Sequence, residues 1–318
     1  MSVGVQIALG GPERAELARP WRDILARHSK SFDLAARLLR PEARDDVALL
    51  YAWCRNADDA IDLARPDEQR AALLRLEAEL EAPRTALGGA FAELCTRARI
   101  PPDYPKELLL GMRMDVDGVR YASLDDLLVY CHRVAGVVGL MLCHVLGVSD
   151  GRALRNAAHL GIAMQLSNVC RDVLEDWGRG RLYLPDDRLE RAGAPGLRAQ
   201  VGAEISSASR AALTRVVREL TELANRFYAS ADRGIPALDP RSAFAVRVAR
   251  LVYSAIGSEL RARRFDACRG RVVVPRWKKL FLVGRALLET LARRLRPGTW
   301  SPVPILPPTR FPHDVLPV

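Results

Sequence analysis

The sequence lacks the features that stabilise many small proteins or hold their metals. Aromatic residues make up only 6% of the 318 residues, and the six cysteines are scattered without any CxxC pair. The five histidines do not have the spacing of metal ligands. A free cysteine in an apolar helical context behaves as a small buried hydrophobe. We therefore expect a reduced, cytoplasmic protein and not a disulfide scaffold.

Segments for export or for crossing a membrane are missing as well. The N-terminal sequence MSVGVQIALGGPERAEL has neither a basic region nor a long apolar run, so it predicts no signal peptide. The longest apolar stretch, residues 134–148, is shorter than the roughly 20 residues that span a bilayer, and His144 interrupts it. We expect no transmembrane anchor.

Strand-favouring runs bounded by turns are scarce, and this scarcity determines the predicted fold class. Ala, Leu, Val and Arg dominate a sequence that is 49% hydrophobic, and such stretches favour helices. We predict an all-α fold with one helical domain over residues 14–296, between an N-terminal extension (1–13) and a proline-rich tail (297–318). The predicted helices cover about residues 30–40, 43–62, 67–81, 86–99, 104–114, 124–147, 150–177, 203–232, 240–268 and 276–296.

The net charge of +10 favours anionic partners. These could be nucleic acid, anionic lipid or phosphorylated small molecules. The basic residues are spread through the helices, without a stripe that alternates with aromatics for base stacking. We therefore expect no nucleic-acid partner, whereas peripheral contact with the anionic inner face of a membrane fits the charge.

A first polar stripe follows one face of the predicted helix 43–62. Tyr51, Arg55, Asp58 and Asp62 stand at positions i, i+4, i+7 and i+11, which share one side of a helix. The rest of this helix is apolar almost all round, and such a helix is usually buried. We therefore expect the stripe to face an internal cavity.

A second stripe lies on the predicted helix 150–177, where Gln165, Asn168, Asp172 and Asp176 share one face and Arg171 flanks it. One such stripe alone would be interpreted as a solvated helix face. Two stripes on otherwise apolar helices indicate a site, because buried carboxylates repel each other unless a cation neutralises them. Oxygen ligands of this kind suit Mg²⁺, with Mn²⁺ as an alternative, and the neighbouring arginines suit a phosphate-like anion.

Six segments, in this order along the chain, resemble those of the squalene/phytoene synthase family in its bacterial carotenoid-type form. They are HSKSF (28–32), LYAWCRNADDAID (50–62), GMRMDV (111–116), YCHRVAGVVGLM (130–141), QLSNVCRDVLEDWGRGRLYLP (165–185) and VPRWKKL (274–280). The resemblance implies a single-domain isoprenoid-synthase helical fold with a central apolar cavity.

The resemblance also implies residue roles. Asp58, Asp62, Asp172 and Asp176 would be the catalytic carboxylates and would ligate Mg²⁺ with Asn168. The residues implied to hold the prenyl diphosphates are His28, Ser29, Lys30, Ser31, Tyr51, Arg55, Gln165, Arg171, Arg181, Tyr183 and Tyr253.

The family reaction implied is head-to-head condensation of two geranylgeranyl diphosphates to phytoene through a cyclopropyl diphosphate, a transferase reaction that opens carotenoid biosynthesis. No NADPH is expected, and neighbouring enzymes of that pathway are implied as partners. Ala36 stands where relatives using C15 substrates tend to have a bulky aromatic, which favours a C20 chain. Two alternatives stay open: a C30 synthase of the same family, and a non-catalytic scaffold relative.

Overall fold

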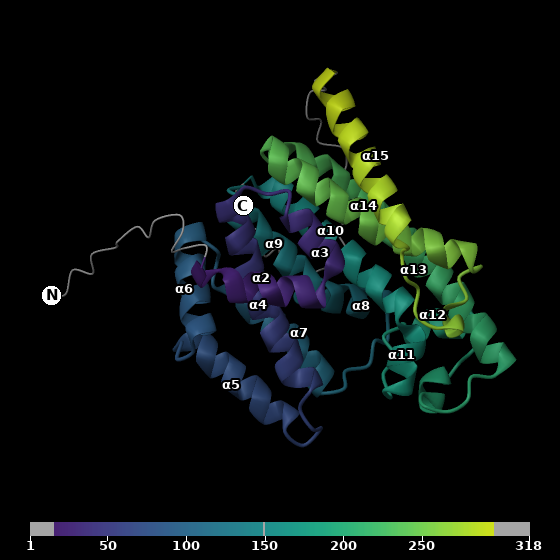
Figure 1. The fold of residues 1–318 in the computed structure, drawn as a ribbon. Helices are drawn as coiled ribbons and strands as arrows, with labels where there is room; N and C mark the ends of the chain where they lie inside the picture. Colours follow the sequence, from purple (N-terminus) through teal and green to yellow (C-terminus); the bar gives the residue numbers. More distant parts are fainter. Residues whose placement is uncertain (1–15, 149, 296–318) are drawn as a thin grey trace.

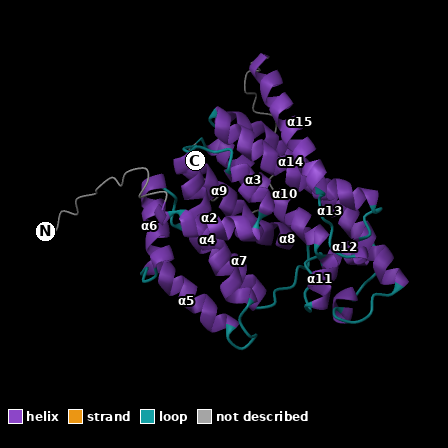
Figure 2. Cartoon of the chain, viewed as in Figure 1, coloured by secondary structure: helices purple, strands orange, loops and turns teal. Residues whose placement is uncertain are grey.

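Helices form every regular element of residues 16–148 and 150–295, the part of the chain described in the computed structural model (Figures 1 and 2). The predicted extension 1–13 and the tail 297–318 lie outside these residues. The helices are α2 (Arg19–His28), α3 (Lys30–Ala36), α4 (Pro41–Asp62), α5 (Gln69–Glu81), α6 (Ala86–Ala98), α7 (Asp103–Val116), α8 (Leu124–Cys131), η1 (His132–Gly136), α9 (Val137–Val145), α10 (Gly151–Arg171), α11 (Val173–Gly178), α12 (Asp186–Arg191), η2 (Leu197–Gln200), α13 (Ser207–Gly234), η3 (Ile235–Ala237), α14 (Pro240–Ala262), η4 (Ala267–Arg269) and α15 (Arg276–Leu295).

The starts of the helices follow from local sequence. Pro41 and Pro240 occupy the first turns of α4 and α14, where a missing backbone N–H costs no intrahelical hydrogen bond. The Ser123 side chain accepts a hydrogen bond from the Asp126 N–H, and the Asp126 carboxylate accepts one from the Ser123 N–H. This reciprocal pair fixes the beginning of α8.

Helix α10 is the centre of the fold and packs against α9, α13 and α14. One buried cluster joins α10 to α13 and α14, and a second joins α4, α5, α6 and α7 to α9. Figure 1 shows the N-terminal helices α4 to α7 on one side of the molecule and α13 to α15 on the other. The cavity described below lies among these two groups of helices.

A continuous helical run, Leu124–Val145, contains α8, α9 and the π-helix η1 between them. By length and composition it could cross a membrane. In the structure Leu127, Leu140 and Met141 are fully buried inside the protein, and Val134 and Val138 line its cavity. The run therefore has the position of a core helix, which meets the same criteria of length and composition.

Two predicted helices end earlier than expected. The range 150–177 is not one helix: it breaks at Asp172, which has φ −102° and ψ 10°. The range 240–268 ends at Ala262 because Arg264 and Phe265 adopt positive φ values of 56° and 62°. The break at Asp172 matters for the site, because it places the Asp172 carboxylate at the junction of α10 and α11 while Asp176 lies within α11.

Candidate active site

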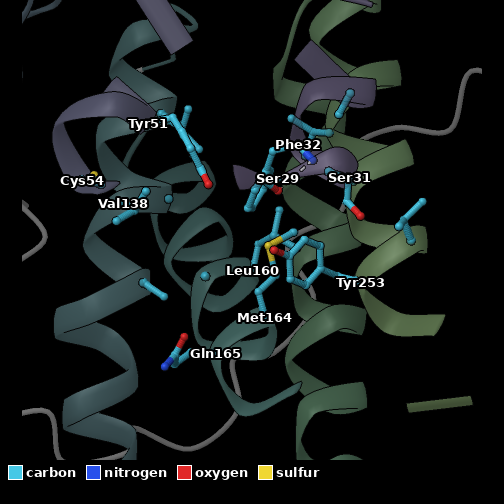
Figure 3. Close-up of a pocket in the computed structure, with 18 of the residues that line it drawn as sticks. Ser29, Ser31, Phe32, Tyr51, Cys54, Val138, Leu160, Met164, Gln165 and Tyr253 are labelled. Atoms are coloured by element: carbon cyan, nitrogen blue, oxygen red, sulfur yellow. Dashed lines mark hydrogen bonds between the residues drawn. The ribbon is translucent and has the colours of Figure 1, made fainter. Parts of the chain in front are cut away.

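A large cavity of about 660 Å³ lies between α3, α4, α10 and α14. Along α4 its lining changes from Val47 and Leu50 to Arg55 and Asp58, and α10 shows the same change from apolar to polar toward its C-terminal end. Figure 3 shows Phe32, Tyr51 and Tyr253 near one another across this space. The Phe32 ring centroid is 6.1 Å from that of Tyr51 and 5.1 Å from that of Tyr253. The cavity therefore has a polar mouth and an apolar interior.

The first predicted stripe reaches the cavity with three of its four residues. Tyr51, Arg55 and Asp58 line it, whereas Asp62 lies outside the lining with 38% of its side chain exposed. Arg55 donates to Asp58 over 3.0 Å and also bonds Asp59. The expectation that the whole stripe faces an internal cavity was therefore wrong at Asp62, because the last turn of α4 extends beyond the cavity.

The second predicted stripe is divided by the break at Asp172. Gln165, Asn168 and Arg171 line the cavity, whereas Asp172 and Asp176 are not among its lining residues. Arg171 donates two hydrogen bonds to the Asp172 carboxylate, of 2.8 and 2.5 Å. The buried Asn168 Oδ1 has no hydrogen-bond partner, although Asn168 Nδ2 donates to Gln165 over 3.3 Å. The polar end of α10 thus presents an oxygen that no protein group satisfies.

Arg181, from the loop after α11, connects the two aspartate motifs. Its guanidinium donates to Asp62 over 3.0 Å. It is also close enough to Asp58, Asp115 and Asp176 to oppose, at each carboxyl, the rise in pKa that burial causes. The carboxylates of α4, α7 and α11 therefore gather around one cation from the chain itself.

Two aspartates at this site, Asp58 and Asp176, have raised pKa values. Burial, followed by the charge of Asp62, raises the pKa of Asp58 to about 6. Burial, followed by the charge of Asp172, raises the pKa of Asp176 to about 7. Neighbouring desolvated carboxylates favour protonation unless a cation is supplied.

A divalent cation fits this donor set. Hard oxygen ligands and an unsatisfied amide oxygen are what Mg²⁺ or Mn²⁺ prefers. Among residues 16–148 and 150–295, no three His, Cys, Asp or Glu side chains are grouped closely enough to form a coordination shell on their own. The residues predicted to ligate the metal therefore do not form a preassembled cage in this part of the chain.

The HSKSF segment forms another part of the cavity wall, since its residues His28 to Ser31 all line the cavity. Ser29 caps α3 by accepting a hydrogen bond from Phe32 N–H and also contacts the Tyr253 side chain. Burial raises the pKa of Tyr253, so this phenol stays a neutral hydrogen-bond donor. Lys30 donates to the Ala26 carbonyl over 2.8 Å and is exposed.

The sequence analysis did not predict four residues at the site, namely Asp115, Tyr130, Arg271 and Lys279. Asp115 accepts hydrogen bonds of 2.9 Å from both Tyr130 and Tyr183, and burial raises its pKa to about 6. Arg271 lines the cavity and contacts Asp172 at 3.4 Å. Lys279 lines it too and donates to Ser31 over 3.2 Å. Asp115, Tyr130 and Lys279 belong to the quoted family-like segments, which were the available signal, whereas nothing in the sequence around Arg271 distinguished it.

Two of the residues implied to hold the diphosphates, Arg181 and Tyr183, have less direct positions. Arg181 and Tyr183 do not line the cavity, and each reaches the site by bonding a carboxylate, Asp62 for Arg181 and Asp115 for Tyr183. The whole arrangement has guanidinium, ammonium and carboxylate groups at the mouth of an apolar chamber. Such a site suits a long apolar molecule with an anionic head group.

Comparison with known proteins agrees with this geometry. The sequence profile of squalene/phytoene synthases matches residues 25–278. A 15-cis-phytoene synthase of Paracoccus sp. is 36% identical over 88% of this chain and 95% of its own length. A phytoene synthase of Pseudescherichia vulneris is 40% identical over 87% of this chain and 95% of its own length.

Solved structures give the same result for the fold. A dehydrosqualene synthase in complex with a ligand has a TM-score of 0.79 and 26% identity, covering 88% of this chain and 99% of that protein. A squalene synthase from Alicyclobacillus acidocaldarius has a TM-score of 0.70 and 23% identity, covering 81% and 97%, respectively. The predicted all-α isoprenoid-synthase fold is confirmed. The chain belongs to the squalene/phytoene synthase family.

Proposed function

We propose that this protein is a prenyltransferase that condenses two geranylgeranyl diphosphate molecules head to head, giving phytoene through a cyclopropyl diphosphate. The observation that carries the proposal is the large cavity with a charged mouth and an apolar interior. The names of the bacterial relatives support the same reaction. In this role the protein would catalyse the first committed step of carotenoid biosynthesis.

Members of this family depend on divalent metal, and we propose Mg²⁺, with Mn²⁺ as a substitute, for this chain. Asp58, Asp62, Asp172 and Asp176 would hold it, together with the unpaired Asn168 Oδ1. When bound, the cation neutralises charge that develops on the leaving diphosphate. Because Arg181 now contacts Asp62 and lies near Asp58 and Asp176, this guanidinium would turn toward the diphosphate when the metal binds.

Protein groups would hold the diphosphates around that metal. Arg55, Arg171 and Arg271 supply guanidinium groups at the mouth, and Lys279 supplies an ammonium beside Ser31. Arginine forks match the geometry of phosphate oxygens. Donors placed where negative charge develops lower the barrier to ionisation. The other proposed diphosphate-binding residues are the basic residues His28 and Lys30 and the hydroxyl or amide donors Ser29, Ser31, Tyr51, Gln165, Tyr183 and Tyr253.

The apolar interior would protect the allylic cation that ionisation creates. Leu142, Leu146 and Val148 form part of its wall, and such side chains offer no hydrogen bond to water. Ala36 also lines the cavity, and its methyl group leaves room where a bulky aromatic would shorten it. This small residue supports a C20 substrate.

A C30 synthase using farnesyl diphosphate is the second candidate. It is favoured by the fold likeness to a dehydrosqualene synthase at 26% identity, but the curated relatives at 36–40% identity are phytoene synthases. A scaffold without activity is disfavoured because all four motif aspartates are present.

The product assay that tests the proposal supplies Mg²⁺ and either the C20 or the C15 diphosphate, without NADPH. Phytoene from the C20 substrate is expected, and the C15 substrate should react poorly. Turnover of the C15 substrate alone would replace the proposal with a C30 synthase. No turnover of either substrate would favour the scaffold alternative.

Three further parts of the proposal concern the cell. We propose a cytoplasmic protein with peripheral contact at the inner membrane face and with neighbouring carotenoid-pathway enzymes, without a nucleic-acid partner and without NADPH. The net charge of +10 and the hydrocarbon nature of the product support the membrane contact.

A further inference from the structure

Helix α15 exposes an unusual amount of apolar surface. More than half of the large hydrophobic side chains exposed in the described residues lie between positions 273 and 291. Trp277, Leu280 and Leu288 are each 69% exposed, and Phe281 is 66% exposed. A contiguous exposed apolar patch often marks an interaction site, whereas single scattered apolar residues do not.

These side chains form one stripe, here called the α15 stripe. It consists of Trp277, Leu280, Phe281, Leu287, Leu288 and Leu291, whose spacing of three, four and seven places them on one helix face. The opposite face contains Leu282 and Ala286, which are buried where α15 packs on α14. Figure 1 shows α15 at the outside of the molecule along α14. The helix thus has an apolar face toward the protein and a second one toward solvent.

The charge of α15 indicates what chemistry would cover this stripe. Residues 276–295 contain six Lys or Arg residues and one acidic residue, Glu289. Arg276 and Arg285 are exposed beside the stripe, and Arg285 forms an ion pair with Glu289 at 2.8 Å. A helix with apolar residues, a Trp and an excess of positive charge suits the interface of an anionic bilayer. A second copy of this basic helix would bring like charges together.

Residues that adjoin the stripe in the sequence line the cavity. Val273 lines the cavity and is 67% exposed, four residues before Trp277. Val274 and Lys279 also line the cavity. The N-terminal end of α15 therefore lies at the mouth of the cavity, where Arg271 and Lys279 line it on either side of Val273 and Val274.

We propose that the α15 stripe inserts into the interfacial layer of an anionic membrane and turns the Val273 edge of the cavity toward lipid. Docking follows from the exposed stripe and its charge. The further step, release of an apolar hydrocarbon into the bilayer at Val273, rests on the proposed function. Docking and release at this edge would let a water-insoluble product pass from the cavity into the bilayer without entering the aqueous phase.

Vesicle flotation of the full-length protein tests the docking. The vesicles are phosphatidylcholine with about 30% phosphatidylglycerol, compared with phosphatidylcholine alone. The wild type is expected to float with the anionic vesicles. Phe281→Ser combined with Leu288→Ser should lower the partition coefficient by at least about tenfold, because two apolar side chains that would be buried in the lipid are lost. Leu74→Ser on α5 is the matched control, since Leu74 is 57% exposed away from α15, and it should float as the wild type does.

The remaining outcomes separate the membrane from other occupants. No flotation of the wild type with anionic vesicles, or equal flotation of the double variant, would overturn the proposal. Loss of flotation in Trp300→Ser combined with Phe311→Ser, with the α15 variant unaffected, would assign the lipid contact to the C-terminal tail. A wild-type dimer in solution that the α15 variant converts to a monomer, without flotation, would assign the stripe to a second copy.

Turnover in detergent keeps this test separate from the proposed function. The α15 double variant should turn over the C20 diphosphate in detergent at the wild-type rate, because neither Phe281 nor Leu288 lines the cavity. With vesicles, wild-type product should appear in the floated fraction. Flotation without any turnover would contradict the proposed function and the product release but would still support the docking.

Discussion

Each aspartate motif sets an arginine beside a carboxylate, so deleting the carboxylate leaves an unbalanced guanidinium at the mouth of the cavity. Arg55 bonds Asp58, and Arg171 holds Asp172 through two hydrogen bonds. In Asp58→Ala or Asp172→Ala the substrate would meet positive charge without a metal ligand. We expect turnover to fall by at least about 10³-fold in either variant, since stabilisation of the leaving group is lost.

Circular dichroism and a product assay check this prediction, because helical content should persist while activity disappears. Asp46→Ala is the control on the same helix. Asp46 pairs with Arg97 and does not line the cavity, so its loss should cost only about 0–1 kcal/mol of stability. Full activity in both motif variants would remove the proposed metal roles.

The buried carboxyl of Asp115 makes the stability of the protein depend on pH. This carboxyl has a pKa of about 6, above the ordinary 3.8, although Tyr130 and Tyr183 both donate to it. Between about pH 4 and pH 6 the folded protein therefore binds more protons than the unfolded chain does. The contribution of this group to stability is present below pH 4 and is lost as the pH rises through 6.

Replacing Asp115 with Asn should remove that loss. Relative to the wild type, Asp115→Asn should gain up to about 3 kcal/mol in the free energy of unfolding as the pH rises from 4 to 7. Turnover should fall roughly tenfold or more, since the two tyrosine hydroxyls lose a charged acceptor. Chemical denaturation at several pH values measures the first effect. Parallel stability curves for the two proteins would show that the Asp115 carboxyl is not the titrating group.

At the scale of elements, the contact between η1 and α10 depends on backbone proximity. A Cβ built on Gly161 would stand 2.1 Å from the Ala135 carbonyl oxygen and 2.8 Å from Gly136 N. Both are main-chain atoms, so no side-chain rotation relieves the overlap. Gly161→Ala should therefore destabilise the protein by about 1–3 kcal/mol or more, and it should lower turnover because Gly161 lines the cavity.

Gly284→Ala is the matched control for that substitution. Gly284 is also helical, but a Cβ there meets nothing within 4 Å. Its replacement should stabilise α15 by about 0.5–1 kcal/mol through lower backbone entropy in the unfolded chain. Thermal melts of the two variants are expected to move in opposite directions. A Gly161→Ala melt equal to that of the wild type would show that the packed backbones can separate at little cost.

The same elements show what local sequence can and cannot predict. The helical periods of α4, α13 and α15 are properties of neighbouring residues, so their existence was predictable. The break before α11 was not, because Asp172 is held by Arg171 and by Arg271, which comes from a distant loop. Asp115 was missed for a similar reason: its importance arises only when α7 meets Tyr130 and Tyr183. The sequence pattern predicted which residues share a face of one helix, but not which faces meet.

At the scale of the whole molecule, separate helices bring carboxylates close to one guanidinium, that of Arg181. Asp58 lies on α4 and Asp176 on α11, and Arg181 lies near both. The proposed cation would displace this arginine and the protons that the carboxyls take up. Bound metal and diphosphate should therefore couple the two groups of helices and raise the melting temperature of the molecule.

The pH dependence of that stabilisation follows from the two raised pKa values. Asp58 titrates near 6 and Asp176 near 7, and a carboxyl must be deprotonated to ligate metal. The rise in Tm caused by Mg²⁺ with inorganic diphosphate should be small at pH 5.5 and several degrees larger at pH 8. Thermal melts at both pH values measure it, and diphosphate without Mg²⁺ is the control for anion binding alone. Asp176→Asn should abolish most of the difference between the two pH values, because it removes the carboxyl with the higher pKa. An Mg²⁺-dependent rise that is equal at both pH values in the wild type would mean that these carboxyls do not bind the metal.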